Sequence, residues 1–136
     1  MSRKLQIDAT DRKILSFLIK NARTPFLEIA RSCGISGAAI HQRIRKLEDA
    51  GIISGSKFIV KPNAVGFDIC AFVGILLDKG HVFDKVIQEI EKIPEIVECH
   101  FTTGTWSLLV KMYCVDNQHL MNVLVNKMQK ITGIAR

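Results

Sequence analysis

The sequence predicts an α+β chain of two parts, a helix-turn-helix over residues 1–61 and a ferredoxin-like unit over residues 62–136. Apolar residues recur at helical spacing as far as Gly51, and runs typical of β-strands alternate with helical segments after it. Pro62 and Asn63 break the pattern between the two parts. Charge divides in the same way, because residues 1–61 carry a net charge of +7 and residues 62–136 a net charge of −1.

The composition excludes membrane-spanning and disordered proteins. Of the 136 residues, 48% are hydrophobic, which is enough for a core, and no apolar run approaches the roughly 18 residues of a spanning helix. Residues 1–8 lack the apolar run of a secretion signal. Four cysteines without a Cys-x-x-Cys pair are expected to be small buried side chains in a reducing compartment. They are Cys33, Cys70, Cys99 and Cys114.

Three helices are expected in the first part, over residues 8–20, 25–33 and 36–50. Asp8 or Thr10 is suited to cap the first of them. The turn between the second and third helices is short, as in a helix-turn-helix, and such a motif leaves its second helix projecting from the domain. A projecting helix fits the major groove of DNA, which is about 12 Å wide.

Particular residues support this motif. Two helices that cross steeply need a small residue on the first, here Ala30, and a glycine in the turn, here Gly34. Ile40 supplies the apolar residue of the crossing, and Ser36 is a favourable N-cap for the third helix. A basic helical face is often only solvated, but the motif together with the +7 charge favours binding to double-stranded DNA.

The third helix divides into a buried stripe and an exposed face. At about 100° per residue, Ile40, Ile44 and Leu47 fall on the buried side. The first turns of such a helix contact base edges, where Gln pairs with adenine and an Ala methyl group contacts the thymine methyl group. The predicted base contacts are Ala38, Ala39, His41 and Gln42, and the predicted phosphate contacts are Ser36, Arg43, Arg45 and Lys46.

The second part has the order strand–helix–strand–strand–helix, which is a ferredoxin-like βαββα unit without its last strand. The β-type run Lys57–Val60 predicts a linker strand before it. A glycine, Gly104, marks the hairpin between the second and third strands. The expected elements are strands over residues 68–77, 96–103 and 106–115 and helices over residues 82–93 and 116–131.

Several motifs resemble those of the Lrp/AsnC (feast/famine) regulators of bacteria and archaea, in the family's order and over nearly the whole chain. They are Asn21-Ala22-Arg23-Thr24, Ile29–Ser36, Arg43–Ile53 and Glu98–Gly104. The resemblance implies a cytoplasmic transcription regulator with a winged helix-turn-helix and a C-terminal domain called RAM. It implies a RAM domain of order βαββα(β) that dimerises through its sheet and assembles dimers into octamers. It also implies that an amino-acid effector, and no other cofactor, binds between dimers.

The hairpin departs from much of the family. Where many members have Gly-Asp-x-Asp, this chain has Gly104-Thr105-Trp106-Ser107, so binding of leucine by the two acids does not carry over. The segment is more similar to the asparagine-responsive AsnC branch. Trp106 is expected to pack on the sheet or in a subunit interface rather than on a ligand. The resemblance implies an effector site of Phe101, Thr102, Thr103, Gly104, Ser107 and Gln129.

Gln129 carries two alternatives. Its carboxamide is able to donate to and accept from the carboxamide of asparagine. Alternatively, it is a solvated polar residue on an amphipathic helix.

No pattern for catalysis or for metal binding is legible. The sequence contains no Ser-His-Asp order and no phosphate loop, so the chain is not expected to be an enzyme. Cys99 and His100 are adjacent on a strand and therefore point to opposite faces, which argues against a zinc site. Two other functions stay open: an architectural DNA-binding protein without an effector, and a small-molecule sensor that has lost DNA binding.

Overall fold

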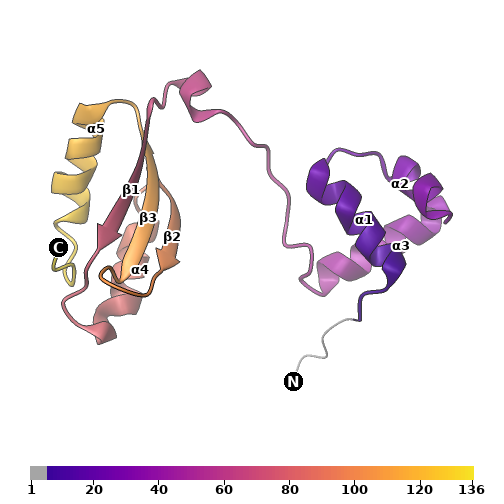
Figure 1. Ribbon diagram of the computed structural model, residues 1–136, viewed down its shortest axis with the longest axis horizontal. Coiled ribbons are helices and arrows are strands. Elements are labelled where there is room, and N and C mark those ends of the chain that lie inside the picture. Colours follow the sequence, from indigo (N-terminus) through magenta and orange to yellow (C-terminus); the bar gives the residue numbers. More distant parts are fainter. Residues whose placement is uncertain (1–5) are drawn as a thin grey trace. The chain divides into compact units, whose positions relative to one another are not determined.

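The structure, a computed structural model, describes residues 6–136 and divides into two compact units, one ending at Phe58 and the other beginning at Ile59 (Figure 1). Residues 1–5, which belong to the segment predicted not to be a secretion signal, lie outside the described residues. Each unit has its own hydrophobic core. Within the described residues, no helix combines the length and the apolar character that crossing a membrane requires.

Three helices form the N-terminal unit: α1 (Ala9–Lys20), α2 (Phe26–Cys33) and α3 (Gly37–Asp49), which confirms the predicted helices. α1 begins with a capping box, in which the Asp8 carboxylate accepts from the Asp11 N–H at 2.8 Å and the Asp11 carboxylate accepts from the Asp8 N–H at 3.3 Å. The five buried residues of the core come from all three helices. They are Ile14, Ile29, Ala30, Ile40 and Ile44.

The linker strand predicted over Lys57–Val60 is wrong. This segment is extended but pairs with no other strand among the described residues, and Phe58 and Ile59 are 72% and 93% exposed. β-propensity favours an extended backbone, but a strand also needs a neighbour to receive its N–H and C=O groups. Phe58 instead packs its ring against the guanidinium of Arg23, whose central carbon lies 4.5 Å from the ring centroid.

The C-terminal unit has the predicted order strand–helix–strand–strand–helix. Its three strands form an antiparallel sheet in the order β1-β3-β2, and two 3₁₀ turns, Pro62–Val65 and Gly80–Val82, precede β1 and α4. The main elements are β1 (Ile69–Ile75), α4 (Phe83–Glu91), β2 (Ile96–Phe101), β3 (Leu108–Cys114) and α5 (Asn117–Asn122).

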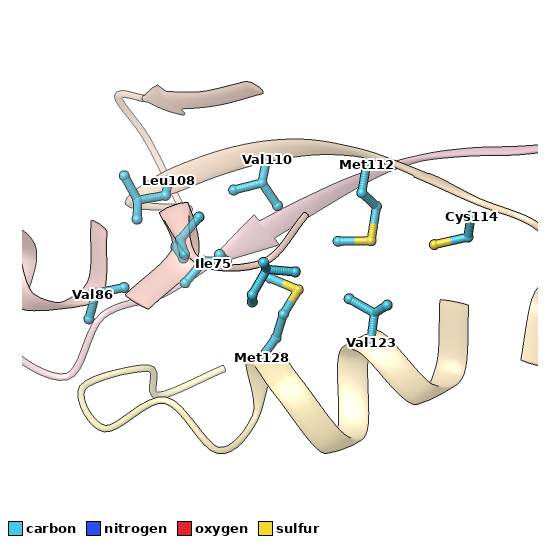
Figure 2. Close-up of a cluster of buried hydrophobic side chains, with 10 residues drawn as sticks. Ile75, Val86, Leu108, Val110, Met112, Cys114, Val123 and Met128 are labelled. Carbon is cyan, nitrogen blue, oxygen red and sulfur yellow. The ribbon is translucent and has the colours of Figure 1, made fainter. Parts of the chain in front are cut away.

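One face of this sheet is covered by α4 and α5. Alternate side chains of β3 are fully buried, as the period of two along a strand requires for a face against a core. Figure 2 shows these side chains directed toward the helix that carries Val123 and Met128, with Ile75 and Val86 beside them. The buried side chains of β3 are Leu108, Val110, Met112 and Cys114.

The other face of the sheet is open. Phe72 is 63% exposed there, and the Lys111 ammonium group lies 5.8 Å from its ring centroid and 5.3 Å from that of Tyr113. Cys70 is exposed, which corrects the prediction that every cysteine is buried. Cys70 lies in a long apolar run, but the elements of this unit cover only one face of its strand. Cys33 and Cys99 are partly buried, and Cys114 is buried.

The last helix is shorter than the predicted span of residues 116–131. α5 passes at Val123 into a π-helical segment, Val123–Met128, and the Gln129 N–H donates to the Leu124 carbonyl at 3.0 Å. Gly133, with φ of +108°, then turns the chain back toward the sheet.

The C-terminal residues pair with the segment that follows β1. The Asp78 N–H donates to the Gly133 carbonyl at 2.8 Å, and Leu77 forms an isolated antiparallel bridge with Ile134. The Ala135 N–H donates to the Leu76 carbonyl at 2.7 Å. The expected last strand of the βαββα(β) order is not a strand of this sheet, but residues 133–136 make antiparallel backbone contacts beside β1.

Candidate DNA interface and effector site

The turn of the helix-turn-helix is fixed by local backbone geometry. Gly34 has φ of +65°, a left-handed conformation that ends α2. The Ile35 N–H then donates to the Ala30 carbonyl at 3.0 Å. Ser36 caps α3, because its Oγ accepts from the Ala39 N–H at 3.1 Å. The oxygen of Ser36 is therefore already used as an acceptor within the protein, and its O–H remains able to donate to an acceptor such as a phosphate oxygen.

α3 has two chemically different faces. Ile40, Ile44 and Leu47 are buried, as the spacing predicts. The opposite side presents small and polar side chains without a covering element in its own unit. Its exposed residues are Ala38, His41, Gln42, Arg45 and Lys46, and Ala39 is partly exposed.

His41 is held in place by a residue that the sequence did not single out. Its imidazole packs edge-on against the ring of Phe26, with 5.1 Å between the ring centroids. Phe26 is the first residue of α2 and is half-buried. The contact restricts the orientation of an exposed imidazole on the outer face of α3. An apolar aromatic residue at the start of the helix before the turn was the available sequence signal.

Arg43 lies in a different environment from the other predicted phosphate contacts. Its Nη1 donates to the Asp8 carboxylate at 2.8 and 3.0 Å and to the Asp11 carboxylate at 3.0 Å. The hydrogen bonds to Asp8 and Asp11 raise the pKa of Arg43, and the hydrogen bond from Arg43 lowers the pKa of Asp8. Arg43 therefore ties α3 to the start of α1.

The predicted effector segment forms the turn between β2 and β3. The Thr102 hydroxyl donates to the Trp106 carbonyl at 2.6 Å, and the Thr102 N–H donates to the Ser107 carbonyl at 3.2 Å. Gly104 has φ of +105°, a conformation that a glycine adopts without strain. Thr103 is exposed. These contacts bring the two ends of the turn together and close it.

Ser107 connects the hairpin to the end of β1. Its N–H donates to the Ile75 carbonyl at 2.8 Å, and its Oγ accepts from the Leu77 N–H at 3.3 Å. Phe101 is exposed but its ring contacts Phe83 edge-on, with 5.4 Å between centroids. Leu77 and Phe83 were not predicted for this site, because only folding brings them to a hairpin more than fifteen residues away.

Gln129 is not joined to the hairpin. It follows the π-helical segment, its side chain is exposed, and among the described residues it makes no hydrogen bond with the turn. The structure thus brings Thr102, Gly104 and Ser107 together and leaves Gln129 on a separate element. In the same described range, no three His, Cys, Asp or Glu side chains gather as they would to hold a metal ion.

Two family models match this chain, one after the other along the sequence. The family model for a winged helix-turn-helix DNA-binding domain matches residues 7–54, and the model for the Lrp/AsnC ligand binding domain matches residues 70–136. The Regulatory protein AsnC of Haemophilus influenzae is 41% identical over 94% of this chain and 85% of its own length. The Regulatory protein AsnC of Escherichia coli K12 is 38% identical over 94% of this chain and 84% of its own length.

The fold agrees with a solved relative as well. The structure of Escherichia coli AsnC superposes with a TM-score of 0.89 at 37% identity, covering 97% of this chain and 89% of that one. A match of this coverage extends over both units and includes the turn of the helix-turn-helix and the β2–β3 hairpin. The chain therefore belongs to the Lrp/AsnC family of DNA-binding transcription regulators, which are not enzymes and which combine a winged helix-turn-helix with a ligand-binding RAM domain.

Proposed function

We propose that this regulator recognises a specific double-stranded DNA site through α3 and that asparagine modulates its occupancy of that site. The single observation that carries the first half is the outer face of α3, whose side chains are exposed or partly exposed and lie opposite a buried apolar stripe. Ala38, Ala39, His41 and Gln42 read base edges in this proposal. Ser36, Arg43, Arg45 and Lys46 contact phosphates and set the register, with Arg43 using the donors that Asp8 and Asp11 leave free.

Salt dependence of DNA binding tests these roles. Lys46→Met is expected to weaken specific and random DNA alike and to lower the slope of log affinity against log salt by about 1. Gln42→Ala is expected to leave that slope unchanged and to weaken only the specific site, by about 1–3 kcal/mol. Equal affinity of the wild-type protein for specific and random DNA would instead support an architectural DNA-binding protein without an effector.

The effector half of the proposal rests on the chemistry of the hairpin. Its turn has no carboxylate, and its neutral groups are those of Thr102, Thr103, Gly104 and Ser107. Relatives 38–41% identical over most of their length carry the name AsnC. The sequence resemblance of the hairpin to the asparagine-responsive branch points to the same ligand. In this proposal Phe101 flanks the ligand. Gln129 of the same chain or of another copy of the chain hydrogen-bonds the asparagine carboxamide.

Thermal unfolding with each of the twenty amino acids tests the effector. A ligand at about 100 times its dissociation constant stabilises the folded form by roughly 2.7 kcal/mol, which corresponds to a shift of several degrees. We expect a selective shift with asparagine. A selective shift with another amino acid would support an amino-acid sensor but exclude asparagine as its effector. No shift with any amino acid would favour the architectural DNA-binding protein without an effector.

We infer that the functional division lies near residue 61, with residues 1–61 binding DNA and residues 62–136 binding the effector and forming the assembly. The open face of the sheet, where Phe72 and Tyr113 lie, supports a homodimer through the sheets and assembly toward an octamer. Sedimentation with and without asparagine tests the link between ligand and assembly. A cytoplasmic location follows from transcription regulation in this proposal.

A further inference from the structure

Arg136 is placed against the hairpin by the fold. Its guanidinium carbon lies 5.4 Å from the centroid of the Trp106 ring. Its backbone is fixed at the same time, because the Leu76 N–H donates to the Arg136 carbonyl at 2.7 Å and the Arg136 N–H donates to the Leu76 carbonyl at 3.3 Å. Thirty residues of sequence separate Arg136 from Trp106, so only the folded chain brings this cation to the candidate effector segment.

Trp106 is a rigid support for that guanidinium. A Cβ atom added to Gly74 would lie 2.6–2.9 Å from three atoms of the indole, so the ring packs directly on the backbone of β1. The Trp106 carbonyl also accepts from the Thr102 hydroxyl at 2.6 Å. The indole is therefore held between the strand and the turn, which agrees with the expectation that it packs on the sheet rather than binding a ligand through its own polar group.

The charge of Arg136 is available for a ligand. Within residues 6–136 it forms no ion pair, and residues 101–107 of the hairpin contain no Asp, Glu, Lys or Arg. A guanidinium stacked on an aromatic face keeps its N–H edges free for a planar bidentate contact. The group that such a fork matches is a carboxylate, and every free amino acid carries one at neutral pH.

We propose that Arg136 binds the α-carboxylate of the amino-acid effector, with Trp106 holding the guanidinium beside the turn. The proposal rests on the proposed effector function and assigns to a side chain the contact that backbone groups near Gly104 would otherwise make alone. Selectivity among amino acids then comes from neutral groups of the site, while Arg136 recognises what all amino acids share.

Calorimetric titration of the full chain with L-asparagine and with L-asparaginamide tests this assignment. The amide retains the amine and the side chain but lacks the α-carboxylate. Arg136→Met is expected to weaken asparagine binding roughly 10- to 100-fold, the range of a hydrogen-bonded charged contact, and to change asparaginamide binding by less than about twofold. The ratio of the affinity for asparagine to the affinity for asparaginamide therefore falls toward one.

Two further variants keep the result interpretable. Arg136→Lys retains the charge without the fork, and we expect it to recover part of the preference. Lys130→Met removes an exposed cation from the same unit and is expected to change neither ligand. Equal weakening of both ligands by Arg136→Met, or no weakening of asparagine, overturns the assignment. Failure of the wild-type protein to bind any amino acid overturns the effector proposal itself. If a different amino acid binds, the same variants are titrated with that amino acid and its amide, and the same outcomes decide.

Discussion

The two units are each stabilised by a cluster of three titratable side chains, and the clusters differ in whether every carboxylate oxygen has a partner. In the N-terminal unit, Arg43 of α3 pairs with Asp8 and Asp11 at the start of α1 at 2.8 and 3.0 Å. The side chain of Asp8 is 55% exposed and that of Asp11 only 11%, and both carboxylates also accept backbone N–H groups of the capping box. Each acid therefore has partners besides the arginine.

The cluster of the C-terminal unit depends on a single oxygen. Oε1 of Glu95 accepts from Lys127 Nζ at 2.6 Å and from His119 Nε2 at 3.1 Å. The Glu95 side chain is only 11% exposed, and its Oε2 is buried without a partner. His119 Nδ1 accepts from the Val115 N–H at 3.0 Å, so Nε2 carries the hydrogen in this arrangement. The cluster connects the start of β2 to both parts of the last helix.

This difference teaches that pair distances alone do not rank ion clusters. Both clusters have contacts below 3.2 Å, and each contains a carboxylate side chain that is only 11% exposed. Asp11 has a second bond, from the Asp8 N–H, whereas the other oxygen of Glu95 is buried without a partner. We therefore expect substitutions around Glu95 to destabilise the protein more than substitutions around Asp8.

The largest effect is expected for Glu95→Leu. The change leaves Lys127 and His119 without their shared acceptor, and we expect about 2 kcal/mol of lost stability, or roughly 10 °C in the midpoint of the C-terminal unit. Trp106 is the one tryptophan of the sequence, so its fluorescence during urea unfolding reports this unit. The double change Glu95→Leu with Lys127→Leu also removes the ammonium group that has lost its acceptor, and it should recover part of the lost stability. An unchanged midpoint for Glu95→Leu would contradict the ranking.

The stability that the Glu95 carboxylate gives should be lost in acid. Burial alone would raise the pKa of Glu95, but hydrogen bonds from Lys127 and His119 outweigh it and hold that pKa below its ordinary value of 4.5. A lowered folded pKa gives stability that is present above 4.5 and lost as pH falls through the folded pKa. The midpoint difference between wild type and Glu95→Gln should therefore stay constant from neutral pH to about pH 5 and shrink below that. A difference that grows on acidification would reverse this assignment.

The comparison also explains how far sequence reasoning reached. The turn at Gly34 and the buried stripe of α3 were predicted, and the cap of α1 was narrowed to Asp8 or Thr10, because each depends on residues within one or two helical turns. The cluster at Glu95 was missed, because its partners lie 24 and 32 residues away and nothing local marks a glutamate at the start of a strand as buried.

Two errors have the same origin. The run Lys57–Val60 has the composition of a strand, but composition does not state whether a neighbouring strand exists. The apolar segment around Cys70 favoured a buried cysteine, although α4 and α5 cover only one face of the sheet. The contact of Arg136 with Trp106 could not be predicted, because it joins segments that are distant in the sequence. Features that depend on neighbouring residues could be predicted from the sequence, whereas contacts between distant segments could not.

A smaller loss is expected for Arg43→Met. Asp8 and Asp11 keep their capping bonds, so we expect roughly 1 kcal/mol of lost stability in the N-terminal unit, the size of a typical lost hydrogen bond. Circular dichroism at the helical band measures this loss during unfolding. Arg45→Met is the matched control, because Arg45 lies on the exposed face of the same helix and should change stability by less than about 0.5 kcal/mol. In DNA binding the order should reverse, with Arg45→Met lowering the salt slope by about 1 and Arg43→Met lowering it less.

The smallest effect is expected for Asp8→Asn. Asparagine caps a helix about as well as aspartate, so the bond from the Asp11 N–H survives and only the charge facing Arg43 is lost. Asp8→Ala removes the cap as well and should lower the midpoint further. Because the pKa of Asp8 is lowered, chiefly by its hydrogen bond with Arg43, the difference between wild type and Asp8→Asn is present above 3.8 and disappears in acid. If Asp8→Asn were as damaging as Asp8→Ala, the charge rather than the cap would hold the start of α1, and the cluster around Arg43 would rank with the cluster around Glu95.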